Sequence, residues 1–336
     1  NGIDTLTNSS SSGSAIQVGA GATLGFNTLN SSAGTVTSAG TLDGDVALSG
    51  TGALVQNAGG SVDGNLSTAG ASAFDINGTS GDATVEVTGT LSQGSTGSST
   101  FAGDVAGNVS VSAGTLTVDG ASEFQSGLNV TGGAVVVDAD LGVTGNTLVD
   151  TGALTVNAGS TLTSNVQSGT LGGGGSVVVD GIVDGTLNVP LADTLATFDI
   201  NAGGSVTGTA THAGTGTSTL AGTVGNLNIT AAGTVQVDGA AVSNGLSFVD
   251  GGGTLAVQAG ASYTASGGPL NVGFDGGNTG SGTLTVADTG SMIGNVSVFN
   301  AGTVDINGTS GDATVEVDGN LTLFAGATDT STLAGD

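Results

Sequence analysis

The chain of 336 residues carries 27 Asp and Glu residues, one His and no Lys or Arg, which gives a formal net charge of −27. Nucleic-acid phosphates are bound through Lys and Arg, so a nucleic-acid partner is excluded, and an anionic membrane surface repels such a chain. The absence of Cys excludes disulfides and thiol chemistry, and no apolar run of about 18 residues is present, so no direct membrane insertion is expected.

Long internal repeats organise the chain. Residues 75–87 return unchanged as residues 305–317, and the similarity extends over longer flanking segments. The long repeats lie around residues 50–104, 174–222 and 280–336. Repetition on this scale is typical of a solenoid, in which each unit buries its apolar face against its neighbours. We therefore expect residues 1–336 to form a single segment of a longer repeat array.

A shorter motif, Gly followed by Thr or Ala and then an alternating strand, recurs about every 20 residues. It predicts strands at residues 114–118, 133–137, 152–156, 233–237, 253–257, 282–286 and 302–306. Alternation places Leu and Val on one face and Thr or Gln on the other. Short strands between Gly- and Asn-rich turns are compatible with an antiparallel sandwich, but the constant period favours an all-β parallel β-helix. The chain length then allows about 16 or 17 coils, and no helix is expected.

One phrase of this motif, Gly152-Ala-Leu-Thr-Val-Asn-Ala-Gly-Ser-Thr-Leu162, resembles the passenger domains of autotransporters, the type V secreted surface proteins. Residues 253–261 and 320–327 carry the same resemblance. It implies a right-handed parallel β-helix that is exported to the outer surface of a Gram-negative cell, commonly as an adhesin or a self-associating protein. Filamentous haemagglutinin-like proteins and surface-layer or filament proteins have similar repeats.

Calcium is the one cofactor for which the sequence offers candidates. Asp75, Asn77 and Glu86 take the first, third and last positions of an EF-hand-like loop, but Ser80 stands where that loop needs Gly. Alternation over residues 84–87 predicts a strand in which Glu86 points outward. Surface carboxylates that bind Ca²⁺ between molecules are a better fit to the unbalanced charge. The candidates are Asp75, Asp82, Asp305 and Asp312, with solvated turn carboxylates as the alternative.

Catalytic signatures are weak. His212 is the only histidine, so a multi-histidine metal site is excluded, and a polar turn position is expected for it rather than a role in a serine hydrolase. A β-helical glycoside hydrolase needs two carboxylates at a set separation, which the many Asp residues allow. Aromatic platforms for sugars are scarce, because the chain has nine Phe, one Tyr and no Trp. Phe74 and Phe198 take equivalent repeat positions and are expected to fill the core.

These observations predict a non-enzymatic, extracellular structural or adhesive protein of the bacterial cell surface. Regular rows of Thr, Ser and Asn suit lateral packing of identical molecules, and terminal coils offer strand edges for end-to-end association. The protein is expected to self-associate into a filament, layer or biofilm matrix. A β-helical stalk of a host- or surface-binding adhesin is the alternative, with binding loops at 90–104 or 263–280, and a glycoside hydrolase is a remote one.

Overall fold

The structure, a computed structural model, describes residues 3–9, 16–169, 173–191, 195–274, 280–308, 316–324 and 332–334. Within these ranges every regular element is a β-strand, and the strand pairs run parallel. The described ranges hold no helix that is long and apolar enough to cross a bilayer. The predicted all-β parallel solenoid with coils of about 20 residues is confirmed.

The chain divides into two compact units, Asn1–Asn165 and Val166–Asp336. The strands of the first unit are β1 (Ile3–Asn8), β2 (Ile16–Val18), β3 (Thr23–Ser31), β4 (Thr35–Ser38), β5 (Thr41–Leu48), β6 (Ala53–Gln56), β7 (Ser61–Asp63), β8 (Leu66–Gly70), β9 (Ala73–Asn77), β10 (Leu91–Ser95), β11 (Ser98–Val105), β12 (Val109–Val111), β13 (Thr115–Phe124), β14 (Leu128–Val130), β15 (Ala134–Val137), β16 (Leu141–Val149) and β17 (Ala153–Val156). Strand β18 (Thr161–Ser168) contains the boundary.

The strands of the second unit are β19 (Ser176–Val179), β20 (Ile182–Asp184), β21 (Leu187–Val189), β22 (Thr197–Ile200), β23 (Ser205–His212), β24 (Thr217–Leu220), β25 (Thr223–Ile229), β26 (Thr234–Val237), β27 (Ala240–Ser243), β28 (Ser247–Val249), β29 (Gly253–Val257), β30 (Ser262–Ala265), β31 (Leu270–Val272), β32 (Ser281–Val286), β33 (Ser291–Ile293), β34 (Val296–Val298), β35 (Ala301–Asn307), β36 (Val317–Asp318), β37 (Leu321–Leu323) and β38 (Thr332–Ala334).

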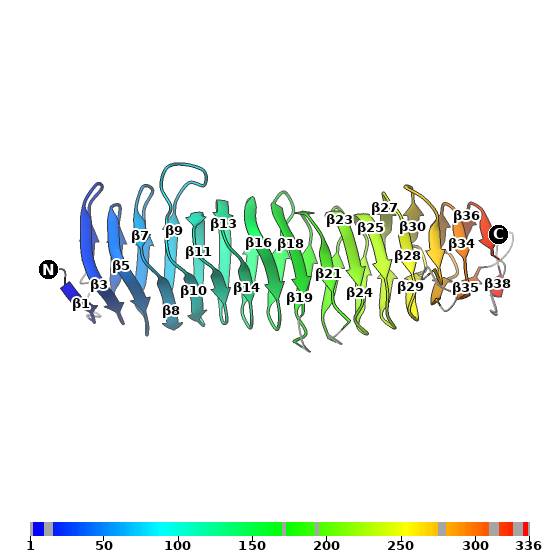
Figure 1. Cartoon of the computed structure of the whole chain (residues 1–336), viewed down its shortest axis with the longest axis horizontal. Helices are drawn as coiled ribbons and strands as arrows, with labels where there is room; N and C mark the ends of the chain where they lie inside the picture. Colours follow the sequence, from blue (N-terminus) through cyan, green and yellow to red (C-terminus); the bar gives the residue numbers. More distant parts are fainter. Residues whose placement is uncertain are drawn as a thin grey trace. The chain divides into compact units, whose positions relative to one another are not determined.

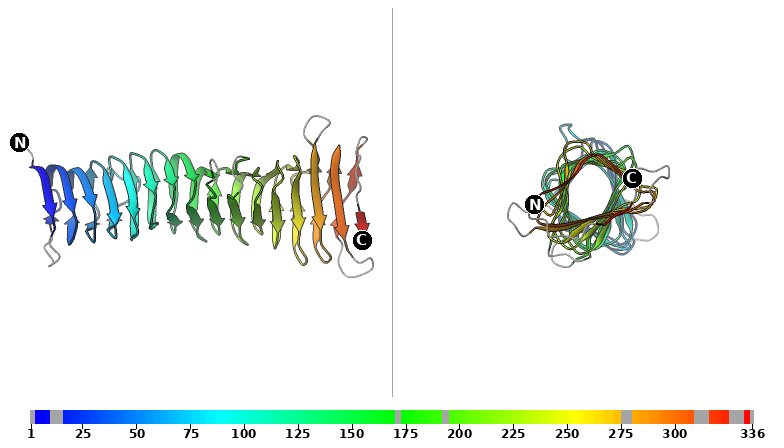
Figure 2. Two further views of the ribbon diagram at one scale, coloured as in Figure 1. Left: turned by 90° about the horizontal axis from the view of Figure 1, so that it is seen from below. Right: turned by 90° about the vertical axis from the view of Figure 1, so that its right-hand side faces the viewer.

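Each coil has three strand segments, and each segment pairs with its equivalent in the next coil. In the first unit, the first half of β13 pairs with β15, its second half pairs with the start of β16, and β14 pairs with the end of β16. In the second unit, β19 pairs with β22, while β20 and β21 both pair with β23. Successive coils of each unit therefore lie side by side (Figure 1, Figure 2).

The core consists of aligned rows of inward side chains. Leu116 pairs in register with Val135, which pairs with Leu154, and all three are buried. The neighbouring positions along each strand are only half-buried, as alternation predicts. Phe74 and Phe198 are both buried, which confirms the prediction that they fill the core.

The coils differ in length. Some coils are longer than the basic period because they carry insertions. Leu66 pairs with Leu91, and Gly253 pairs with Gly282, so these two coils add several residues each to the usual length. The insertion in the first of these coils forms the loop described below.

Candidate functional site

A loop of residues 78–86 follows β9 and projects beyond the neighbouring coils of the first unit (Figure 1). This loop is the first copy of the duplicated block. The sequence predicted a strand over residues 84–87, but these residues are irregular except at Val87, which bridges to Val62 and Val105. The predicted strand is therefore wrong, because the chain returns to the sheet only at Val87.

Glu86 is the buried anchor of this loop. Its side chain is only 1 % exposed, and its carboxylate accepts the backbone N–H groups of Asp104 at 2.6 Å and Thr79 at 3.4 Å. Burial raises the pKa of Glu86, the nearby Asp104 carboxylate adds to the rise, and the N–H groups oppose it. The prediction of an outward strand residue is wrong, and a buried Glu86 is also unsuited to the last ligand position of an EF-hand.

Glycines provide the space that Glu86 occupies. A Cβ atom at Gly78 would lie 2.2 Å from Cδ of Glu86. The second copy of the block repeats this packing, because Glu316 is buried and its Cδ lies 2.1 Å from the ideal Cβ position of Gly308. Gly78 and Glu86 recur together as Gly308 and Glu316, and this shared repetition is the feature of the sequence that could have revealed the buried glutamate.

Asp104 lies directly beneath the loop. It is 6 % exposed, and its Oδ2 accepts the backbone N–H of Gly81 at 3.2 Å, while its Oδ1 is buried with no hydrogen-bond partner. In the next coil Asp104 pairs in register with Glu123, whose Oε1 accepts the hydroxyl of Thr144 at 2.9 Å. We call Glu86, Asp104 and Glu123, which occupy successive coils, the acidic ladder.

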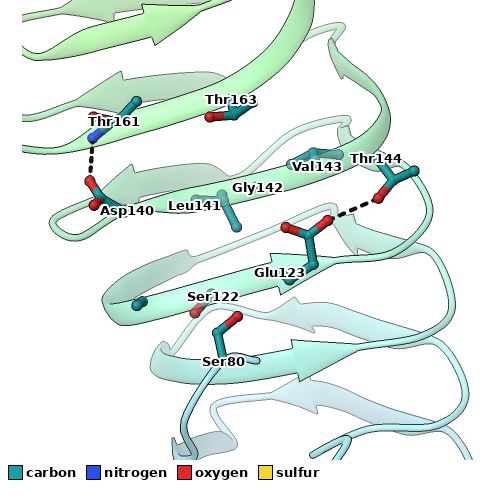
Figure 3. A pocket seen from close by; sticks show the side chains of 11 residues that line it. Ser80, Ser122, Glu123, Asp140, Leu141, Gly142, Val143, Thr144, Thr161 and Thr163 are labelled. Carbon is teal, nitrogen blue, oxygen red and sulfur yellow. Dashed lines mark hydrogen bonds between the residues drawn. The ribbon is translucent and has the colours of Figure 1, made fainter. Parts of the chain in front are cut away.

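A groove opens between the tip of the loop and the coils that follow it (Figure 3). Its volume is about 720 Å³. The lining is mainly hydroxyl and carboxylate groups, namely those of Ser80, Ser122, Glu123, Asp140, Thr144, Thr161 and Thr163. In Figure 3 Ser80 reaches from the loop to lie beside Ser122, and Glu123 leans toward Thr144. A second groove of about 460 Å³, which includes Asp63, lies against loop residues 83–85.

Sequence comparison gives no further assignment of this site. No protein-family model, curated protein or solved structure matches the chain. The parallel β-solenoid agrees with the fold that the resemblance implies.

The structure describes three of the four predicted calcium residues. Asp75 Oδ1 accepts the hydroxyl of Thr100 at 2.7 Å, and Asp82 Oδ1 accepts the backbone N–H of Thr84 at 2.6 Å. Asp305 lies on β35 of the second unit, and Asp312 is outside the described residues. Across the described ranges, no three His, Cys, Asp or Glu side chains are close enough to hold a metal ion. Calcium binding by these residues between molecules stays a prediction.

Many exposed or half-buried carboxylates connect adjacent coils. In each pair a carboxylate oxygen accepts a hydrogen bond from a Thr hydroxyl or an Asn amide in the coil that follows. The pairs are Asp4–Asn27, Asp45–Asn65, Asp63–Thr88, Asp75–Thr100, Glu123–Thr144, Asp138–Asn157, Asp180–Asn201, Asp184–Thr207 and Asp199–Thr219. Charge-assisted hydrogen bonds thus take the place of the ion pairs that a chain without Lys and Arg cannot make.

His212 lies in the core of the second unit. The side chain is 0 % exposed, with Nδ1 at 3.2 Å from the Ser218 hydroxyl and Nε2 at 3.0 Å from the Gly216 carbonyl oxygen. Ser218 Oγ also accepts the backbone N–H of Phe198 at 3.0 Å. The ring of Phe198 packs edge-on against the imidazole. The predicted turn position is wrong, and this Ser–His pair is a satisfied core network.

The imidazole of His212 should titrate below its ordinary pKa of 6.5, because burial lowers the pKa. The unfolded chain then binds more protons than the folded chain just below that pH, so the free energy of unfolding should fall as the pH drops through 6.5. The slope is at most about 1.4 kcal/mol per pH unit. NMR can follow this single imidazole without ambiguity, and His212→Gln should show a smaller slope. An imidazole midpoint at or above the ordinary value would contradict this assignment.

The structure also describes Tyr263 and one of the two ranges that were predicted to hold binding loops. Tyr263 is buried, bonds to Ser247 at 2.8 Å, and burial raises its pKa to about 12, so it offers no platform to a sugar. Residues 90–104 are not a binding loop, because β10 and most of β11 occupy them. Of the range 263–280, residues 275–279 lie outside the described residues.

Proposed function

We propose that this protein is a non-enzymatic structural or adhesive component of an extracellular bacterial surface. In this proposal it is a member of the autotransporter-like passengers, and it self-associates into a filament, a layer or a biofilm matrix. The observation that carries the proposal is the regularity of the outward rows. In the second unit Thr234, Thr254, Thr283 and Thr303 stand in register on four successive coils, all half-buried.

Such a row presents identical hydroxyl groups at the interstrand spacing of about 4.8 Å. A second copy of the chain has the same spacing, so its rows match this surface over many coils at once. Identical weak contacts repeated along a surface add up, which favours assembly over single encounters.

The net charge of −27 opposes this packing unless cations screen or bridge the carboxylates. In this proposal divalent cations bridge carboxylates of neighbouring molecules, so assembly depends on them rather than on salt alone. Hydrogen bonds between coils hold these carboxylates in position, which keeps the arrangement of charges regular.

Electron microscopy of the protein with calcium, with sodium chloride of equal ionic strength, and with a chelator tests the proposal. We expect ordered filaments or sheets with calcium that come apart on chelation. Thr254→Asp and Thr283→Asp, which place charge in the row, should weaken assembly, whereas Thr254→Ser should not. Assembly that responds only to ionic strength would remove the cation from the proposal.

The projecting loop favours one alternative, a stalk whose loops bind a host or abiotic surface. The loop of residues 78–86 stands between two grooves and occurs twice in the sequence. Isolated particles in every condition of the microscopy experiment would favour this stalk over a self-associating protein. The remote glycoside hydrolase stays a prediction, for which Glu123 and Asp140 in the groove are the carboxylates to mutate.

A further inference from the structure

The acidic ladder buries two carboxyl groups without a protein cation beside them. Glu86 and Asp104 are almost fully buried, and the chain has no Lys or Arg to lie against them. The Glu86 carboxylate accepts the backbone N–H groups of Thr79 and Asp104, and the Asp104 carboxylate accepts that of Gly81. A buried carboxylate without a counter-charge is strongly destabilising, so its surroundings favour either the neutral form or a bound cation.

One atom of the ladder points to a ligand independently of the charge. Oδ1 of Asp104 is buried and has no hydrogen-bond partner, although Oδ2 of the same carboxylate bonds to Gly81. Buried polar atoms are nearly always satisfied by protein, water or an ion. A carboxylate oxygen can only accept, so its missing partner is a donor or a cation.

We infer that the acidic ladder and the loop above it form a binding site for a divalent cation of the Ca²⁺ type, with the carboxylates of Asp104 and Glu123 as its anionic ligands. The hydroxyl of Ser80 lines the same groove as Glu123 (Figure 3). Hydroxyl, carboxylate and water oxygens together are the hard ligands that Ca²⁺ prefers, and two carboxylates suffice when other oxygens complete the shell.

The spacing of the ladder fits this ion. Asp104 and Glu123 are register partners on adjacent strands, which lie about 4.8 Å apart. Carboxylates that leave neighbouring strands at this spacing can both reach one Ca²⁺ ion, which binds oxygen at about 2.4 Å. The ion needs a path to solvent, which the open groove beside Glu123 provides.

Glu123 has the freedom to take part. It is half-buried and leans toward Thr144, and its Oε2, the flexible end of the side chain, lies over Gly142 at 1.9 Å from the ideal Cβ position. Binding of the ion should turn Glu123 toward Asp104 and break its hydrogen bond with Thr144. The site lies within one chain, so it goes beyond the proposed function and holds whether or not the protein assembles.

Calorimetric titration of CaCl₂ into the dilute full chain, in about 0.15 M NaCl to screen exposed carboxylates, tests the inference. The wild type should show one binding equivalent that Asp104→Asn and Glu123→Gln each weaken at least 10-fold, an effect of about 1.4 kcal/mol. Asp45→Asn is the matched control, because Asp45 is an exposed carboxylate of the same unit that bonds to Asn65 instead.

Calcium should also protect the loop from a protease that cuts at exposed aspartate, with Asp82 as the reporter bond. Circular dichroism verifies that each variant is folded, and the half-buried Glu123 is the safer substitution if Asp104→Asn destabilises the chain. Equal calcium binding by the wild type and Glu123→Gln would overturn the site, and so would equal weakening by the Asp45→Asn control. Light scattering checks that the dilute protein stays unassembled as calcium is added, so failure of the titration leaves the assembly proposal standing.

Discussion

Replacing Phe101 by alanine should lower the free energy of unfolding by about 3–5 kcal/mol. The Phe101 side chain is fully buried on β11, with its ring edge-on to that of Phe124 at a centroid distance of 5.6 Å. Its backbone pairs with Ile76 in the preceding coil and with Val118 in the following coil. Because both ladders hold the strand in place, the surroundings cannot close the cavity, and the cost should lie toward the upper end of that range.

Urea unfolding followed by circular dichroism measures the loss, and hydrogen exchange locates it. A solenoid is stabilised by contacts between neighbouring coils, so faster exchange should be concentrated in β9, β11 and β13. Phe324→Ala is the control, because the Phe324 side chain is 45 % exposed and its removal should cost about 1 kcal/mol or less. A similar cost for the two substitutions would show that Phe101 does not fill the core as described.

The core of the solenoid could be predicted because inward positions follow the simplest pattern in the sequence. Leu116 and Val118 alternate with threonine, and the same spacing returns in the next coils, so both the buried face and the period were visible. Glycine-rich turns gave the strand ends to within a few residues. The lengths of individual coils could not be predicted, because an insertion in the sequence can either add a coil or enlarge one.

Burial of the polar residues could not be predicted in the same way. His212 stands in register between Val189 and Ile229, so it belongs to a core row, but its polarity favoured a turn. Glu86 sits in an alternating segment that looks like a strand, and only the fold of residues 78–86 above it makes it buried. Asp104 and Glu123 were overlooked because their pairing depends on a register shift within β11.

A large loss of stability is also expected from a substitution at this register shift. Gly103 lies at the irregularity between Phe101 and the rest of β11, and its φ is +123°, a conformation that side chains rarely adopt. A Cβ atom there would also lie 2.3 Å from Oε2 of Glu86. Gly103→Ala should therefore cost about 2–3 kcal/mol, from backbone strain and from the loss of buried hydrogen bonds at Glu86.

A matched substitution separates this effect from the general cost of replacing a glycine. Gly25 lies on β3 of the same unit, and its nearest neighbour is the Asp43 carboxylate at 3.7 Å, so Gly25→Ala should leave stability unchanged or raise it by about 0.4–1 kcal/mol. If Gly103 makes room for Glu86, then Glu86→Ala should cost much less in the Gly103→Ala background than in the wild type. Additive costs would mean that only the backbone of Gly103 matters, and that the burial of Glu86 does not depend on it.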